Sequence, residues 1–376
     1  MNLNKLYIST AVLAVAAGIT YFVKSADSAK PEDPRLGTAI VSNDDLNKVT
    51  TLELISGSES MTFRYDADAS NWQLQERHNL PADTKKITDL TNQLKETKLQ
   101  RIASRKPERI ADFGFGIDYI NLHDADGNSV LSLDLGRETD AGKQLVRFGQ
   151  EELAFIASDS FSVNGDPVSW LDKTLLKTER DEIRSATFQL ENGDTLSVAR
   201  ESENDDWTTE DSLPDGKQLD QGAITRALNR LVSINFIRLA EHGDPEVVGA
   251  QEHSYTISYT LADDTTYTIT AGRRPEVKVE KEVETTNDEG ETITETQEEV
   301  ETPVGAVFVK ISSSDETAPI NDYMTRTAFA TTSTLYTAAP ESLDALLADI
   351  PEPEPEPEPE SDSEPTEEAV EETAAE

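Results

Sequence analysis

The chain has 376 residues, 36% of them hydrophobic, which allows two or three folded domains of modest size. Its 33 basic and 74 acidic residues give a formal net charge of -41, which argues against tight binding to nucleic acid or to an anionic membrane surface, because both need cationic groups that neutralise phosphate. No cysteine is present, so disulfides, thiolate metal sites and lipid attachment to an N-terminal cysteine are excluded.

An uncharged apolar segment opens the chain. Residues 6–23 lie between Lys5 and Lys24 and contain no charged side chain. As a helix this segment is roughly 27 Å long, which just spans the hydrocarbon core of a bilayer. The sequence therefore predicts a transmembrane anchor after a cytoplasmic stub at 1–5, with the bulk of the chain outside the cytoplasm. A cleaved signal peptide is the alternative interpretation.

A first folded unit is predicted over residues 49–178, after a polar stalk at 24–48 that contains two prolines. Short runs of alternating apolar and polar residues are typical of antiparallel strands. These runs lie at 49–55, 61–65, 72–74, 117–123, 130–135 and 144–148. Leucines at helical spacing predict one amphipathic helix over 84–98, and the segment 168–176 predicts a short helix that closes the unit.

Residues 179–349 repeat this order, with Trp207 following Trp72 by 135 positions. The Gly136-Arg137 step after a strand is likewise matched by Gly272-Arg273. The sequence thus predicts an α+β fold of two similar antiparallel-sheet-plus-helix units that arose by internal duplication. The residues that repeat are apolar residues, tryptophans and glycines, which build cores and turns and carry out no chemistry. The structural anchors of the two copies are Trp72, Trp207, Leu90, Leu94, Ile224 and Leu228.

Two acidic segments accompany the second unit. The insertion at 276–301 holds 11 acidic residues and two lysines. Its alternating valines and the turn sequence at 287–290 favour a projecting hairpin, whereas its charge density is equally typical of disorder. Residues 350–376 form a Pro-Glu repeat and an acidic tail, which predicts an extended and disordered C-terminus.

The combination of an anchor, the Trp72-Gln73-Leu74 step, the Leu80 to Asp83 step before a leucine-spaced helix, and a second similar copy resembles the bacterial domain of unknown function 4340 family. The resemblance covers roughly residues 49–345. It implies an envelope protein that accompanies an ABC-type transporter related to gliding-motility systems, with the permease, the ATPase and a GldG-like auxiliary protein as partners. The family brings no catalytic residues, so none is assigned.

The sequence lacks common catalytic motifs. Its four histidines, His78, His123, His242 and His253, form no His-Glu-x-x-His pair, and the 113–116 segment lacks the lysine of a phosphate-binding loop. Two acidic turns have the one-three-five spacing of calcium ligands without the bidentate glutamate at position 12, so turn capping is the simpler interpretation. These turns contain Asp66, Asp68 and Ser70, and Asp124, Asp126 and Asn128.

We therefore expect a single-pass protein of the bacterial inner membrane whose bulk is periplasmic. Its expected role is that of a non-enzymatic accessory or scaffold protein in an ABC-type transport or envelope system. No catalytic, cofactor-binding or metal-binding residue is predicted. A free-standing binding protein for envelope polysaccharide or peptidoglycan, a structural spacer and an enzyme are the alternatives.

Overall fold

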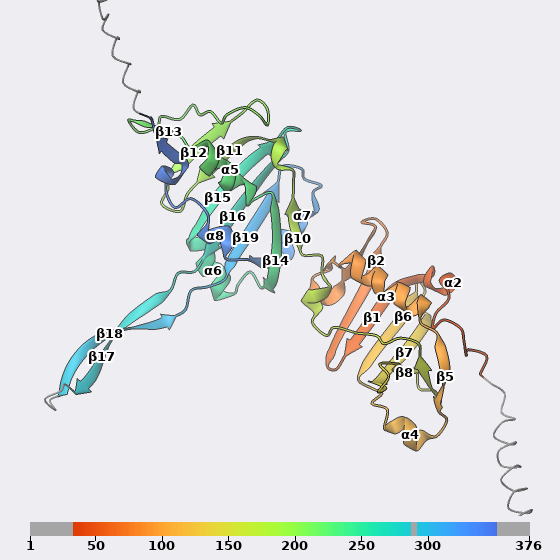
Figure 1. Ribbon diagram of the computed structural model, residues 1–376. Helices are drawn as coiled ribbons and strands as arrows, with labels where there is room; N and C mark the ends of the chain where they lie inside the picture. Colours follow the sequence, from red (N-terminus) through yellow and green to blue (C-terminus); the bar gives the residue numbers. More distant parts are fainter. Residues whose placement is uncertain (1–32, 287–291, 352–376) are drawn as a thin grey trace, which may run out of the picture.

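The computed structural model describes residues 33–286 and 292–351, which form two α+β units lying side by side (Figure 1). Both units consist mainly of antiparallel strands with a few short helices. Within the described residues, no helix combines the length and the apolar character needed to cross a membrane. The anchor predicted for residues 6–23 lies outside those residues.

The first unit is one antiparallel sheet with short helices attached. Its elements are α2 (Asn43–Leu46), β1 (Val49–Ser56), β2 (Glu59–Asp66), β3 (Asn71–Leu74), β4 (Leu80–Pro81), α3 (Thr84–Glu96), β5 (Leu99–Ser104), α4 (Pro107–Ala111), β6 (Asp118–Asp124), β7 (Ser129–Glu138), β8 (Gln144–Phe148) and β9 (Ala154–Ala157). The nine strands follow the order β4-β3-β2-β1-β6-β7-β8-β9-β5.

Helix α3 covers one face of this sheet (Figure 1). The Asp83 side chain caps its N-terminus by accepting a hydrogen bond from the backbone N–H of Lys85 at 3.0 Å. Ile87, Leu90 and Leu94 share one side of the helix and are buried in the main core. Burial of each such side chain stabilises the unit by roughly 1.5–3 kcal/mol.

The second unit is built in a similar way. Its elements are β10 (Thr174–Lys177), β11 (Ile183–Gln189), β12 (Thr195–Ala199), β13 (Lys217–Leu219), α5 (Gln221–Asn229), β14 (Ser233–Ala240), α6 (Pro245–Glu252), β15 (Ser254–Leu261), β16 (Thr266–Arg273), β19 (Val307–Ser313), α7 (Pro319–Arg326), β20 (Ala328–Thr331), α8 (Thr334–Thr337) and β21 (Leu347–Asp349). Eight strands follow the order β10-β14-β20-β19-β16-β15-β11-β12, and β13 pairs with β21. Helix α5 is capped by Asp220 and buries Ile224 and Leu228.

The two sheets share one strand order. The series β2-β1-β6-β7-β8-β9-β5 in the first unit corresponds to β12-β11-β15-β16-β19-β20-β14 in the second. The registers agree as well, because Asp134 on β7 faces Arg147 on β8, and Thr270 on β16 faces Lys310 on β19. Two register shifts break the pairing of β5 with β9, and the one between Leu99 and Arg101 corresponds to the shift between Phe236 and Arg238 in the pairing of β14 with β20. Only β3 and β4 extend the first sheet, and only β10 extends the second.

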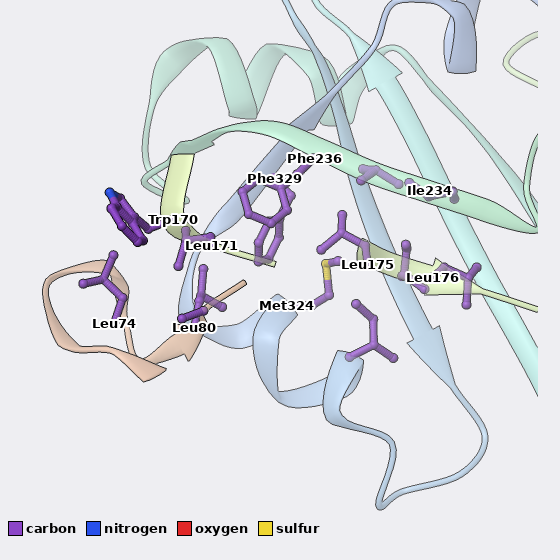
Figure 2. Close-up of a cluster of buried hydrophobic side chains, with 14 of the residues drawn as sticks. Leu74, Leu80, Trp170, Leu171, Leu175, Leu176, Ile234, Phe236, Met324 and Phe329 are labelled. Carbon is purple, nitrogen blue, oxygen red and sulfur yellow. The ribbon is translucent and has the colours of Figure 1, made fainter. Parts of the chain in front are cut away.

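A buried connection joins the units. After a 3-10 helix at Pro167–Trp170, Leu171 bridges Ala82 of the first unit, and β10 then pairs with β14 of the second sheet. Figure 2 shows these connecting residues among apolar side chains from both units, Leu74 and Leu80 from the first, Phe236 and Phe329 from the second. Trp170 and Leu171 are only 5% and 2% exposed. The connection is therefore part of the core.

An arginine clasps the units at their surface. Arg326, at the end of α7, donates to the backbone carbonyls of His78 at 3.1 Å and Asn79 at 2.9 Å. Both acceptor residues have left-handed backbones, with φ values of 57° and 52°. Such conformations are costly for non-glycine residues, so surrounding contacts must hold the loop. Arg326 from the other unit supplies two of these contacts.

Two predicted boundaries differ from the structure. The segment 33–48 packs on the first unit and is no stalk, because Ile40 and Val41 are buried and the N–H of Ile40 donates to the carbonyl of Thr97; residues 24–32 lie outside the described part. The segment 168–176 is no regular helix, because its last residues pair with β14. The first unit thus ends near Leu171, earlier than the predicted residue 178.

The acidic insertion forms an antiparallel arm. Strands β17 (Val277–Thr286) and β18 (Thr292–Thr302) pair with each other and project from the second unit (Figure 1). At its base Arg273 faces Val307 across β16 and β19, so the arm interrupts two strands that pair directly. The predicted turn at 287–290 lies outside the described residues. The arm is therefore an addition to the sheet and no part of its core.

Candidate functional site

A hollow of about 350 Å³ lies between α6, α7 and the outer face of the second sheet. Its apolar lining includes Val247, Phe308 and Met324. Thr270 and Lys310 add polar groups from neighbouring strands. Apolar walls with a few convergent polar groups are typical of small-molecule sites, and this volume lies near the lower end of their usual range. The hollow is therefore the candidate functional site.

The polar side of the hollow carries a cation without a carboxylate partner. Among the described residues, none forms an ion pair or a hydrogen bond with the Lys310 ammonium group. Thr270, which faces it across the strands, shares its hydroxyl hydrogen bond with Thr256 at 2.9 Å. His242 also lines the hollow, with Nε2 3.3 Å from the carbonyl oxygen of Thr325. The described residues that line the hollow thus carry one positive charge, that of Lys310, and no carboxylate.

The corresponding place in the first unit contains an internal ion pair. Asp134 and Arg147, which occupy the registers of Thr270 and Lys310, form a salt bridge in which the aspartate side chain is fully buried. The other oxygen of Asp134 accepts the backbone N–H of Gly116 at 2.9 Å. The Arg147 guanidinium also lies 4.9 Å from the centre of the Phe115 ring. A carboxylate therefore neutralises the cation at this position of the first unit.

The two places differ in volume, with a hollow of about 230 Å³ beside α4 in the first unit and one of about 350 Å³ beside α6 in the second. Phe113 and Ile156 belong to a small buried cluster beneath α4 of the first unit. Judged by strand register and by the glycine contacts, their counterparts in the second unit are Ala250 and Ala330. Ala250 lines the hollow and leaves space that Phe113 occupies in the first unit, whereas Phe308 is larger than its counterpart Leu145.

Two glycines let the short helices approach the sheets. A Cβ on Gly272 would lie 1.9 Å from the carbonyl oxygen of Ala250 in α6, and a Cβ on Gly136 would lie 2.7 Å from that of Phe113 after α4. Neither distance is possible for a real side chain, so glycine is required for close packing. The Gly-Arg steps found in the sequence thus mark the places where helix and sheet meet.

Glu246 positions the base of the arm and the start of α6. Its Oε1 accepts the backbone N–H of Ala306 at 2.7 Å, and its Oε2 accepts Arg238 Nη2 at 2.6 Å. The backbone hydrogen bond from Ala306 lowers the pKa of the Glu246 carboxyl, burial opposes this shift, and Arg238 adds to it. The carboxylate is therefore held in its charged form.

A second polar group ties α8 to the far end of the sheet. The Tyr336 hydroxyl donates to Glu191, whose other oxygen lies 3.1 Å from His253 Nδ1. Burial, followed by the hydrogen bond to Glu191, raises the pKa of Tyr336 to about 12, so the phenol stays protonated near neutral pH. Arg273 lies 5.0 Å above its ring. The arrangement fastens α8 to the sheet.

The sequence-selected anchors lie in cores or against them. Trp207 is 5% exposed, whereas Trp72 is half-buried and makes an edge contact with Tyr65. The aspartates of the two acidic turns accept backbone N–H groups within their own turns, as Asp66 does from Asp68 at 3.0 Å and Asp124 does from Asn128 at 2.8 Å. Neither turn lies at the hollow.

Sequence reasoning missed the residues of the hollow and the buried ion pair. The sequence gives no clear signal for Asp134, because β7 alternates apolar and polar residues and Asp134 occupies one of the polar places. Its pairing with Arg147 and the matching of that pair with Thr270 and Lys310 depend on strand register, which the sequence does not display.

Residues 72–253 match the family described as Domain of unknown function (DUF4340). This part of the chain belongs to that family. The DUF4340 segment runs from Trp72 in β3 to His253 after α6, so it contains the buried connection and parts of both units. The resemblance seen in the sequence is thereby confirmed for these residues. No curated protein and no solved structure matches the chain.

Proposed function

We propose that the chain is a non-enzymatic accessory or scaffold protein of an ABC-type transport or envelope system. In this proposal residues 6–23 anchor it in the bacterial inner membrane, and the two units lie on the periplasmic side. The transporter permease, its ATPase and a GldG-like auxiliary protein are the proposed partners. Membership of the DUF4340 family supports the assignment, since the resemblance implies such a setting.

The projecting arm is the observation that carries the proposal. An isolated two-stranded hairpin is only marginally stable in water, and its outer edges present unpaired backbone groups that can pair with another chain. Val279 and Val300 are 38% and 47% exposed on it, and Glu280 faces Glu298 directly across the strands. Lys278 pairs with Glu298 at 3.4 Å and Lys281 with Glu299 at 2.9 Å, but the arm keeps an excess of acidic residues, so contact with a more basic partner would stabilise it.

A rigid body supports a scaffold role as well. Trp170, Leu171, Leu175 and Leu176 of the connection are buried in the core, and Arg326 donates hydrogen bonds to the loop at His78 and Asn79. Both contacts oppose rotation of one unit against the other. A protein that holds its partners at a fixed spacing needs such resistance, because rotation at the joint would change the distance between the bound partners.

We further propose that the two units arose by duplication. The shared strand order, the matching registers and the paired glycines support this origin. In a duplicated pair one copy is free to lose packing and gain another role. The additions to the second unit, the arm and the hollow, fit that history.

Deletion of the arm tests the scaffold role. Residues 277–302 are replaced by a short Gly-Ser turn in the full chain, and the protein is recovered from membranes with its partners after mild cross-linking. Because β16 and β19 pair directly at the base, the variant should fold with an unchanged melting temperature. We expect it to lose the transporter subunits that the wild type recovers.

A matched control separates the loss of the arm from the loss of negative charge. Removal of residues 352–376 takes away 12 acidic residues and no basic one, and should leave partner recovery unchanged. The proposal is wrong if the folded arm deletion still recovers the same subunits in the same amount. It is equally wrong if the wild type recovers no transporter subunit.

A further inference from the structure

We propose that the hollow beneath α6 binds a small monocarboxylate. Its carboxylate would pair with Lys310, and its apolar body would lie against Val247, Phe308 and Met324. This inference does not depend on the scaffold proposal, because it concerns a different surface of the second unit.

The first unit indicates which chemistry the position accepts. There the cation of β8, Arg147, is neutralised by the carboxylate of Asp134 on the neighbouring strand. In the second unit Lys310 occupies the position of Arg147, and Thr270 occupies the position of Asp134, so within the described residues the cation has no neighbouring carboxylate. A ligand carboxylate would restore the pair that the second unit lacks. A charge-assisted hydrogen bond of this kind is roughly twice as strong as a neutral one.

The lining indicates what is attached to the carboxylate. The small side chain of Ala250, in α6, borders a space of about 350 Å³ whose apolar walls include Val247, Phe308 and Met324 and whose polar groups include Gln251, Ser254 and Thr327. An aliphatic or aromatic body would fill that space and regain the contacts that the larger residues of the first unit make.

The protein's overall charge makes carboxylate binding a discriminating test. With a formal net charge of -41, the chain repels small anions in general. Saturable binding of a carboxylate would therefore have to come from a specific site.

The methionines provide a local readout. The chain has three, of which Met324 lines the hollow and Met61 is fully buried in the first unit. The full chain is labelled with 13C at the methionine methyl groups and titrated with butyrate, octanoate and 4-phenylbutyrate. The Met324 methyl signal should shift saturably, most tightly with the two larger acids, while the Met61 signal stays in place. The neutral 4-phenylbutyramide should bind about tenfold more weakly or worse.

Two variants test the role of the cation. Lys310→Gln should weaken binding of 4-phenylbutyrate about tenfold or more, and Thr270→Asp should do the same by supplying the internal carboxylate of the first unit. Lys95→Gln, at an exposed position of α3 in the first unit, is the matched control and should bind as the wild type does. Since Lys310 is exposed, its variant should fold even if Thr270→Asp does not.

Three results would overturn the proposal. These are equal affinity for the acid and the amide, wild-type affinity in a folded Lys310→Gln protein, and no saturable shift of the Met324 methyl by any of the three acids at millimolar concentration.

Discussion

Substitution of Gly272 by alanine tests the packing of α6 on the second sheet. The new Cβ would lie 1.9 Å from the carbonyl oxygen of Ala250, so the atoms must separate by 1.5 Å to reach an ordinary contact of 3.4 Å. Neither side can yield cheaply, because β16 is paired on both edges and the carbonyl belongs to a helix backbone. Overpacking typically costs about 1–3 kcal/mol, and two backbone segments in conflict place Gly272→Ala at about 3 kcal/mol or more.

The matched positions give a graded series. Gly136→Ala, with its nearest backbone atom at 2.7 Å, should cost less, about 1–2 kcal/mol. Gly243→Ala meets nothing within 4 Å and should change stability by less than about 0.5 kcal/mol. Denaturant unfolding followed by tryptophan fluorescence measures all three, with Trp207 reporting on the second unit. If Gly272→Ala were as stable as Gly243→Ala, the close approach of α6 to the sheet would be refuted.

Three further perturbations follow from the fold. Leu94→Ala, at a fully buried position of α3, should lower the free energy of unfolding by about 2–5 kcal/mol in a denaturant titration, whereas a cost below about 1 kcal/mol would show that α3 does not cover the core. Arg326→Gln should leave each unit folded but loosen the joint between them, seen as faster hydrogen exchange in the 75–81 loop; unchanged exchange would speak against the clasp. Because the pKa of Glu246 is lowered in the folded state, the carboxylate stabilises the fold above its ordinary pKa of 4.5, and this stabilisation is lost as pH falls through the lower folded value. Glu246→Gln should therefore be less stable than the wild type at pH 7, and its stability should depend less on acid. Parallel curves of stability against pH for the two proteins would contradict this linkage.

The sequence by itself determined the elements whose signals are local. Helix α3 begins after Asp83 and buries its leucines as the spacing predicts, and the strand predicted at 144–148 is β8 with the same bounds. Capping and periodicity act within a few residues, so they can be read without knowledge of the rest of the chain. The matched Gly-Arg steps were visible for the same reason.

Only the tertiary structure decided features that depend on distant partners. Residues 33–48 are mostly polar and include a proline, yet Ile40 and Val41 are buried because this segment packs beside the end of α3 and the start of β5. The segment after Trp170 became a strand because β14 had a free edge to pair with. Here tertiary packing outweighs local propensity.

The candidate site is the clearest case of such dependence. Lys310 can be recognised as a candidate binding residue only after strand register places it opposite Thr270, and after the first unit is seen to place Asp134 opposite Arg147. The larger volume of the second hollow follows in part from Ala250, which stands where the first unit has Phe113. A sequence shows each of these residues, but their volumes and charges combine only after strands far apart in the chain have paired, because packing is a property of neighbours in space.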